Sequence, residues 1–137
     1  MTKPKSALAG TVLLLAAATI TAAPSRADDV MHSVRYTITA DNPIYANINY
    51  LDTEPSNFGV YSHNPYQFMP NVQADVGPGQ PWTYDLKLRN PDWWAMVTAN
   101  TGGEPGTPNL HCQLTVDGAA VATNDGPKGV LCSLRTW

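Results

Sequence analysis

The chain has 137 residues and a formal net charge of −3 at pH 7, a length that suits a single domain. An excess of acidic side chains repels phosphate backbones, which argues against a nucleic-acid-binding protein. The composition includes 12 prolines and 10 glycines. Strong helical periodicity is absent after residue 27, so a mainly helical protein is not expected.

The first 27 residues have the features of a secretory signal peptide. Lys3 and Lys5 form a short basic region, residues 7–23 form an uncharged apolar run, and residues 25–27 (SRA) resemble a signal-peptidase site. The apolar run also leaves open an uncleaved membrane anchor, since a spanning helix needs about 20 residues. We expect cleavage, which predicts a protein that is secreted or held in the periplasm or cell envelope.

Cleavage would leave one domain, residues 28–137. Five basic side chains would then stand against eleven acidic ones, which gives a net charge of −6. Such a balance gives no support to charge-driven binding of an anionic lipid surface. Contact with a membrane is therefore expected only if residues 1–27 stay attached.

Two cysteines are present, Cys112 and Cys132. In an exported chain, two cysteines most simply form one disulfide. Closing a loop of about 20 residues would stabilise the fold by about 3 kcal/mol. The alternative is a pair of buried free thiols.

Apolar and polar residues alternate in most segments beyond residue 32, a pattern typical of half-buried strands. In chain order, the expected strands are residues 33–40, 44–51, 82–89, 93–99, 110–116, 119–123 and 130–136. About seven short strands separated by turn residues predict an immunoglobulin-like antiparallel β-sandwich. Both cysteines fall on inward faces of their strands. Residues 72–76 could add a further strand.

The connection formed by residues 52–81 is unusually long for a compact domain and holds five prolines and three glycines. Because it also carries apolar and aromatic side chains, it either packs over the core or presents a contact surface. On a strand, Trp93 and Trp94 would face opposite sides, so one ring could be exposed or covered by this segment; packing of both rings is the alternative. The candidate ligand- or partner-binding residues are Tyr61, Tyr66, Phe68, Met69 and Trp94.

No motif for catalysis or metal binding is found. The three histidines match no zinc spacing, and His111 should lie on the strand face opposite Cys112, at the surface. No GxSxG motif is present, and residues 102–108 lack the lysine of a phosphate-binding loop. We therefore expect no enzyme, no cofactor and no bound metal. An envelope hydrolase of the glycosidase type needs two carboxylates at a fixed distance, and the sequence has scattered carboxylates. This hypothesis therefore stays open as the least favoured one.

Several short motifs follow one another along the chain: the strand with Tyr36, residues 46–52 (ANINYLD), Pro81-Trp82, residues 93–97, and residues 112–118 (CQLTVDG) before Cys132. In this order they resemble the extracytoplasmic domain of the mycobacterial MmpS family. The resemblance covers most of residues 33–135. It implies a small immunoglobulin-like sandwich with one disulfide, without enzymatic activity, that assists MmpL transporters in exporting lipids or siderophores.

Two features depart from that family, namely the expected cleavage of the N-terminal segment and the longer connection between Asp52 and Pro81. The leading hypothesis is an exported MmpS-like binding or adaptor protein. Its partner would be a transporter-like envelope protein or a lipidic small molecule. The alternative is a secreted immunoglobulin-like protein-interaction module of unrelated role.

Overall fold

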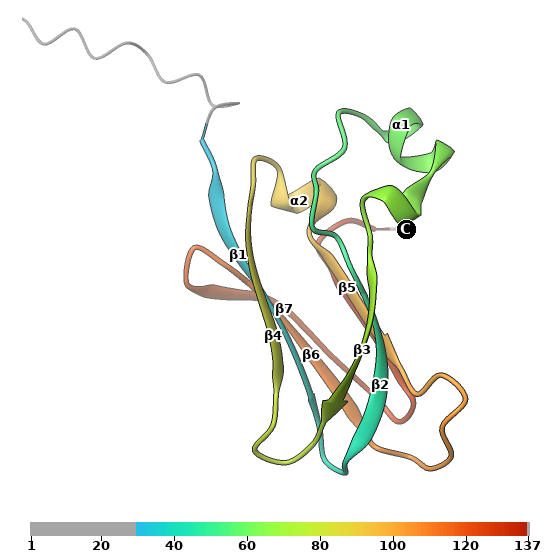
Figure 1. Ribbon diagram of the computed structural model, residues 1–137. Helices are drawn as coiled ribbons and strands as arrows, with labels where there is room; N and C mark the ends of the chain where they lie inside the picture. The colour runs from blue at the N-terminus through green and yellow to red at the C-terminus, as the bar shows by residue number, and fades with distance from the viewer. Residues whose placement is uncertain (1–29, 137) are drawn as a thin grey trace, which may run out of the picture.

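The computed structural model describes residues 30–136, so the expected signal peptide, residues 1–27, lies outside the described residues. Figure 1 shows two layers of strands with short helices gathered at one end. The strands are β1 (His32–Ala40), β2 (Ile44–Tyr50), β3 (Asn71–Val76), β4 (Trp82–Leu88), β5 (Met96–Asn100), β6 (Leu110–Val116), β7 (Ala119–Gly126) and β8 (Gly129–Ser133). The helical elements are α1 (Phe58–His63), the 3-10 helix η2 (Pro65–Gln67) and α2 (Pro91–Trp94).

The strands form two four-stranded antiparallel sheets, in the orders β4-β1-β6-β7 and β3-β2-β5-β8. The register places Tyr36 of β1 between Tyr84 of β4 and Leu114 of β6. The predicted fold class, an antiparallel β-sandwich with one disulfide, is confirmed. Eight strands are present among the described residues, because residues 71–76 form β3.

Alternate residues of the strands face the space between the sheets, as the sequence pattern predicted. In β1, Val34, Tyr36, Ile38 and Ala40 are buried, and the residues between them retain contact with solvent. Burying apolar side chains from both sheets in this way supplies the main favourable term in folding. The predicted strands at 33–40 and 82–89 therefore match β1 and β4 within one residue at each end.

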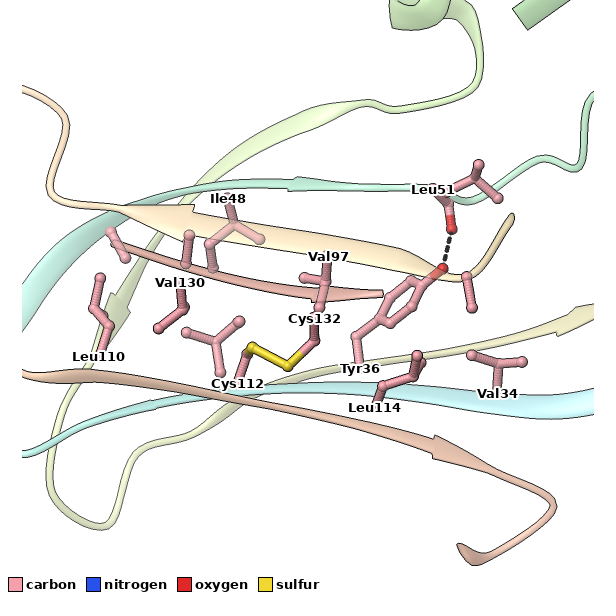
Figure 2. Packing of buried hydrophobic residues seen from close by; sticks show 14 of the residues in the cluster. Val34, Tyr36, Ile48, Leu51, Val97, Leu110, Cys112, Leu114, Val130 and Cys132 are labelled. Carbon is pink, nitrogen blue, oxygen red and sulfur yellow. Dashed lines mark hydrogen bonds between the residues drawn. A yellow bond between two sulfur atoms is a disulfide. The ribbon is translucent and has the colours of Figure 1, made fainter. Parts of the chain in front are cut away.

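The hydroxyl of Tyr36 is a polar group inside this core (Figure 2). It donates a hydrogen bond to the carbonyl oxygen of Leu51, at 2.7 Å, and accepts one from the backbone N–H of Met96, at 3.3 Å. Burial raises the pKa of this hydroxyl, so it stays protonated and remains a donor. One buried side chain of the first sheet thus satisfies two backbone groups of the second.

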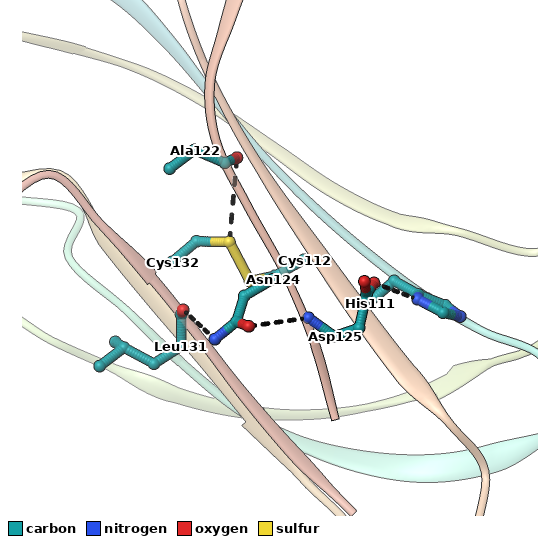
Figure 3. Close-up of a disulfide and its surroundings, with 7 residues drawn as sticks. All are labelled: His111, Cys112, Ala122, Asn124, Asp125, Leu131 and Cys132. Atoms are coloured by element: carbon teal, nitrogen blue, oxygen red, sulfur yellow. Dashed lines mark hydrogen bonds and ion pairs between the residues drawn. A yellow bond between two sulfur atoms is a disulfide. The ribbon is translucent and has the colours of Figure 1, made fainter. Parts of the chain in front are cut away.

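The disulfide joins Cys112 of β6 to Cys132 of β8 and so links the two sheets. The two Cα atoms are 6.0 Å apart, which is within the usual range for a disulfide. Beside it, the side-chain amide of Asn124 donates to the carbonyl oxygen of Leu131 at 3.1 Å and ties β7 to β8 (Figure 3). The cross-link and this hydrogen bond hold the edge of the sandwich that ends in the β7–β8 hairpin.

Aromatic rings close the opposite edge of the sandwich. The ring centroid of Tyr50 on β2 lies 4.5 Å from that of Tyr84 and 5.1 Å from that of Trp82, both on β4. Tilted aromatic pairs at these distances stabilise a packed interface beyond the area that they bury. The edge strand β4 is therefore held against the second sheet by side chains, without backbone pairing.

The long connection at 52–81 is more structured than the sequence indicated. The backbone N–H of Asp52 donates to the carbonyl oxygen of Phe68 at 3.0 Å, and that of Tyr50 donates to Pro70 at 3.2 Å. These bonds bring both ends of the segment together, so β3 returns antiparallel to β2 with Asn49 opposite Asn71. The interpretation of 52–81 as one 30-residue connection is wrong, because α1 and η2 form a closed insertion within a β2–β3 hairpin.

The predicted strand at 93–99 is also shorter than expected, since β5 begins at Met96. Trp93 and Trp94 lie in α2, which has Pro91 at its first helical position and follows Asn90. Proline is favoured at that position because it has no N–H to leave unpaired. Successive helical residues differ by about 100° in direction. Trp94 is therefore 9% exposed and packs on the core, whereas Trp93 is 58% exposed.

Candidate functional site

The helical elements and the end of the chain gather at one end of the sandwich (Figure 1). We call this surface the aromatic end. It is made by α1, η2, α2 and Arg135, and its side chains are Phe58, Val60, Tyr61, Tyr66, Phe68, Met69, Trp93, Trp94 and Arg135. The five predicted binding residues all lie here, although they come from segments more than 20 residues apart in the sequence.

An N-cap fixes the start of α1. The side-chain oxygen of Asn57 accepts a hydrogen bond from the backbone N–H of Val60 at 2.8 Å, and this cap satisfies one of the unpaired donors of the first turn. With the helix set in this way, the ring of Tyr61 faces the core, while Phe58 and Val60 remain 49% and 42% exposed.

A buried layer supports the exposed side chains. Phe68, Met69 and Trp94 are 7%, 8% and 9% exposed. The ring centroid of Tyr61 lies 6.4 Å from that of Phe68 and 5.6 Å from that of Trp94, and its hydroxyl lies 3.3 Å from the sulfur of Met69. Partial burial raises the pKa of Tyr61. Four of the five predicted residues thus form the layer beneath the surface, and Tyr66, at 80% exposed, stands on it.

Arg135 lies among three rings from two helices. Its guanidinium carbon is 4.7 Å from the ring centroid of Phe58, 5.1 Å from that of Trp93 and 5.8 Å from that of Trp94. Cations within about 6 Å of a ring face are attracted by the ring quadrupole. Arg135 therefore links α1 to α2 and holds the exposed rings of Phe58 and Trp93 in place.

Sequence reasoning missed Phe58, Trp93 and Arg135 as members of the site. The Asn90-Pro91 pair could have revealed the helix start and the different environments of the two tryptophans. No local signal marks Arg135, because only the fold brings the C-terminal segment to α1 and α2. In the expected last strand, residues 130–136, the alternation of apolar and polar residues did not mark Arg135 as a site residue.

An open groove of about 740 Å³ lies beside the aromatic end. Its walls are mainly polar and charged and include Asp52, Glu54, Lys87 and Arg89, with Trp94 at one side. The carboxylate of Glu54 accepts a hydrogen bond from the backbone N–H of Asn90 at 2.8 Å, which anchors the turn before α2. Lys87 of β4 and the buried Trp94 of α2 both line this groove.

Two of the three histidines carry ion-pair partners, and the third, His63, lies in the last turn of α1. The ring of His32 pairs with Asp117 at 2.6 Å. His111 faces outward, as predicted, with Nδ1 2.5 Å from Asp125 and Nε2 2.8 Å from Asp41. Within residues 30–136, no three histidine, cysteine or acidic side chains are grouped so that they could hold a metal ion.

We expect the pairing of His111 to make stability depend on pH. Hydrogen bonds to Asp125 and then Asp41 raise its pKa above the ordinary value near 6.5. The stabilisation should be complete below that value and be lost as the pH rises through the raised pKa of the folded protein. The loss should stay below about 1 kcal/mol because the pairs are solvent-exposed.

Urea denaturation between pH 6 and pH 9 measures this dependence. His111→Gln should flatten the pH profile, whereas Gln113→Ala, at an exposed position on the same strand, should keep the wild-type profile. Equal slopes in wild type and His111→Gln would show that His111 does not cause the pH dependence.

Among residues 30–136, no helix has the length and apolar character needed to cross a membrane. A family model for the Rv2576c beta-sandwich domain matches residues 36–132. Two similar proteins are the uncharacterized protein Rv2576c of Mycobacterium tuberculosis (strain ATCC 25618 / H37Rv) and the uncharacterized protein Mb2606c of Mycobacterium bovis (strain ATCC BAA-935 / AF2122/97). Each is 39% identical over 113 residues, which cover 82% of this chain and 73% of the relative.

These matches correct the resemblance to the MmpS family, which no comparison supports. The motifs on which the resemblance rested, such as residues 112–118, combine a cysteine with a strand pattern and a turn pattern. Strand alternation and an Asp-Gly turn recur in unrelated sandwiches because the same local geometry requires them. The role in MmpL transport that the resemblance implied is therefore withdrawn. Because the matching family model covers most of the chain, the protein belongs to the family of the Rv2576c beta-sandwich domain.

Proposed function

We propose that this protein is an exported, non-catalytic binding module that docks a partner protein of the cell envelope through the aromatic end. The observation that carries the proposal is the set of exposed rings at the aromatic end, two of which, Phe58 and Trp93, pack against Arg135. Phe58, Tyr66 and Trp93 are each about half exposed or more, although they are large apolar groups. Neighbouring exposed apolar side chains at one place on a domain favour a contact surface.

The residue types support a protein partner. Tryptophan, tyrosine and arginine are the residues that most often dominate binding energy in protein interfaces. The aromatic end offers Trp93, Tyr66 and Arg135, with Phe58 beside them. Because Arg135 already lies against the rings of Phe58 and Trp93, less side-chain freedom is lost on binding, and this order favours affinity.

The shape of the site favours a protein over a lipidic ligand. A small apolar ligand needs a concave pocket with apolar walls. At the aromatic end the inner space is filled by Phe68, Met69 and Trp94, and the adjoining groove is lined mainly by polar and charged groups. The exposed rings therefore offer an outer surface that suits the surface of another protein.

A non-catalytic role is supported by the surroundings of the histidines. Both ring nitrogens of His111 face carboxylates, so neither is open to accept a proton from a nucleophile. Exposed carboxylates such as Asp41 and Asp125 are engaged with that ring. Export, in turn, rests on the signal-peptide pattern of residues 1–27 and on the disulfide, which persists in oxidising compartments.

Photo-cross-linking in the native organism tests the proposal. A benzoylphenylalanine residue would replace Tyr66 at the aromatic end, or Gln113 on the outer face of β6 as the matched exposed control. We expect one discrete protein adduct from position 66 and none from position 113. Adding Trp93→Ala should reduce the adduct about tenfold or more, the usual effect of losing an interface hot spot.

Equal adducts from both positions would contradict the proposal, because they would indicate unspecific encounters. An adduct from position 66 that is unaffected by Trp93→Ala would also contradict it. Circular dichroism of the Trp93→Ala variant serves as the folding control, and the exposure of Trp93 predicts an unchanged spectrum.

A further inference from the structure

A second distinctive surface lies on the outer face of the sheet β3-β2-β5-β8, away from the core. Alternation turns polar residues of three neighbouring strands to this side. We call it the amide face, and define it by the side chains of Asn47, Asn49, Asn71, Gln73 and Asn100. In register, Asn49 lies opposite Asn71 and Asn47 lies opposite both Gln73 and Asn100.

Hydrogen bonds fix the orientation of the four asparagine amides. Nδ2 of Asn71 donates to Oδ1 of Asn47 at 2.8 Å and to Oδ1 of Asn49 at 3.1 Å. Nδ2 of Asn47 donates to Oδ1 of Asn100 at 3.4 Å. The backbone N–H of Gly102 also donates to Oδ1 of Asn100, at 2.8 Å. The network therefore runs across three strands and into the loop that follows β5.

The network leaves hydrogen-bonding groups unused on the same face. A side-chain amide has two N–H donors and a carbonyl oxygen with two lone pairs. Among residues 30–136, Nδ2 of Asn49 and Nδ2 of Asn100 meet no acceptor, and Oδ1 of Asn71 meets no donor. Gln73 is exposed and has both ends of its amide available. Open donors and acceptors thus lie on neighbouring strands, which are spaced about 4.8 Å apart.

The charge of the amide face indicates the kind of ligand. Among the outward residues of β2, β3 and β5, Asp75 is the one with a formal charge, and it stands opposite the exposed ring of Tyr45. The outer face of the other sheet differs, since it carries the ion pair of Arg35 and Asp85. The five amides carry no charge and offer both donors and acceptors, which matches an uncharged ligand whose own groups offer both.

We propose that the amide face binds an uncharged polysaccharide. Every sugar hydroxyl both donates and accepts, so neighbouring hydroxyls can satisfy Gln73 and the open groups of Asn71 and Asn100. The ring of Tyr45, 47% exposed, provides an apolar platform for the C–H face of a sugar ring. This site is separate from the aromatic end and does not depend on the function proposed for it.

Affinity electrophoresis of the complete exported chain tests the proposal. Native gels would contain dextran, galactomannan or hydroxyethyl cellulose as uncharged probes, and carboxymethyl cellulose as the charged counterpart of the last. We expect at least one uncharged polymer to retard the protein, and carboxymethyl cellulose to retard it less. Gln73→Ala and Tyr45→Ala should each weaken the retardation constant about 2- to 10-fold.

Gln113→Ala on β6 is the matched control, since it removes an exposed amide from the opposite face, and it should bind as the wild type does. The side chain of Gln73 makes no hydrogen bond within the described residues, so Gln73→Ala should leave the network of asparagine side chains intact. Retardation by no uncharged polymer, or equal behaviour of Gln73→Ala and Gln113→Ala, would overturn the proposal. Trp93→Ala should retain full retardation, which separates this site from the aromatic end.

Discussion

Replacing both cysteines, as Cys112→Ala with Cys132→Ala, is expected to lower the free energy of unfolding by about 3 kcal/mol. The disulfide spans 20 residues and joins one sheet to the other. On the chain-entropy model, its loss gives the unfolded chain freedom that the cross-link removed. Both cysteines are also buried, so the alanines leave small gaps in the core.

Urea unfolding followed by tryptophan fluorescence measures this loss. Reducing the wild-type protein with dithiothreitol should shift the urea midpoint in the same direction as the double substitution. The double variant itself should not respond to dithiothreitol. An unchanged midpoint in the double variant would mean that packing alone holds the two sheets together.

Removing the hydroxyl of Tyr36 is expected to cost about 2 kcal/mol in the free energy of unfolding. Tyr36→Phe keeps the buried ring and its packing. It takes away the donor to the carbonyl of Leu51 and the acceptor for the N–H of Met96. Both backbone groups then lose their tyrosine partner in a place that water does not readily reach, and unpaired buried groups cost about 1–3 kcal/mol.

The matched control is Tyr66→Phe, which removes the same hydroxyl from a side chain that is 80% exposed. It should change stability by less than about 0.5 kcal/mol. Equal urea midpoints for Tyr36→Phe and the wild type would contradict the role assigned to the buried hydroxyl.

The strands were the part of the fold most open to prediction from the sequence. The alternation in residues 33–40 and 82–89 determines which side chains face the core. A one-residue shift would turn Val34 and Tyr36 to solvent. The disulfide was also predictable, since both cysteines fall on inward strand faces. These features rest on local periodicity and on the small number of cysteines, which the sequence displays directly.

The insertion between β2 and β3 was not predictable in the same way. Its closure depends on backbone bonds from Asp52 and Tyr50 to residues 16 and 20 positions later in the chain. Such long-range pairing leaves no periodic trace in a segment rich in proline. The apolar content of the segment correctly indicated a link to the core, yet it could not separate the buried Phe68 and Met69 from the exposed Tyr66.

The residues of the aromatic end could be predicted only in part from the sequence. A pattern of paired aromatics led to Trp94 as a contact residue, whereas the short helix α2 buries that ring and exposes Trp93. The position of Arg135 over the rings arises from the path of the chain after β8. The contacts of Arg135 join residues 41 to 77 positions apart in the sequence, so they can be identified only from the three-dimensional fold.

Substitutions at the aromatic end and at the amide face should each affect a different binding partner. Rings such as Phe58 and Trp93 are held by Arg135, and their loss should affect a protein contact. Amides such as Gln73 lie on another side of the sandwich and should affect a polysaccharide contact. The two sets of variants therefore test two surfaces of one domain independently.

The mass of the native assembly shows whether the aromatic end holds a partner protein. The wild-type chain and a Phe58→Ser, Tyr66→Ser, Trp93→Ser variant would be recovered under mild conditions from the native organism and compared by native electrophoresis. We predict that the wild type migrates in a complex larger than the single chain and that the triple variant migrates as the chain alone. A complex of unchanged mass in the triple variant would contradict the claim that the aromatic end holds the partner.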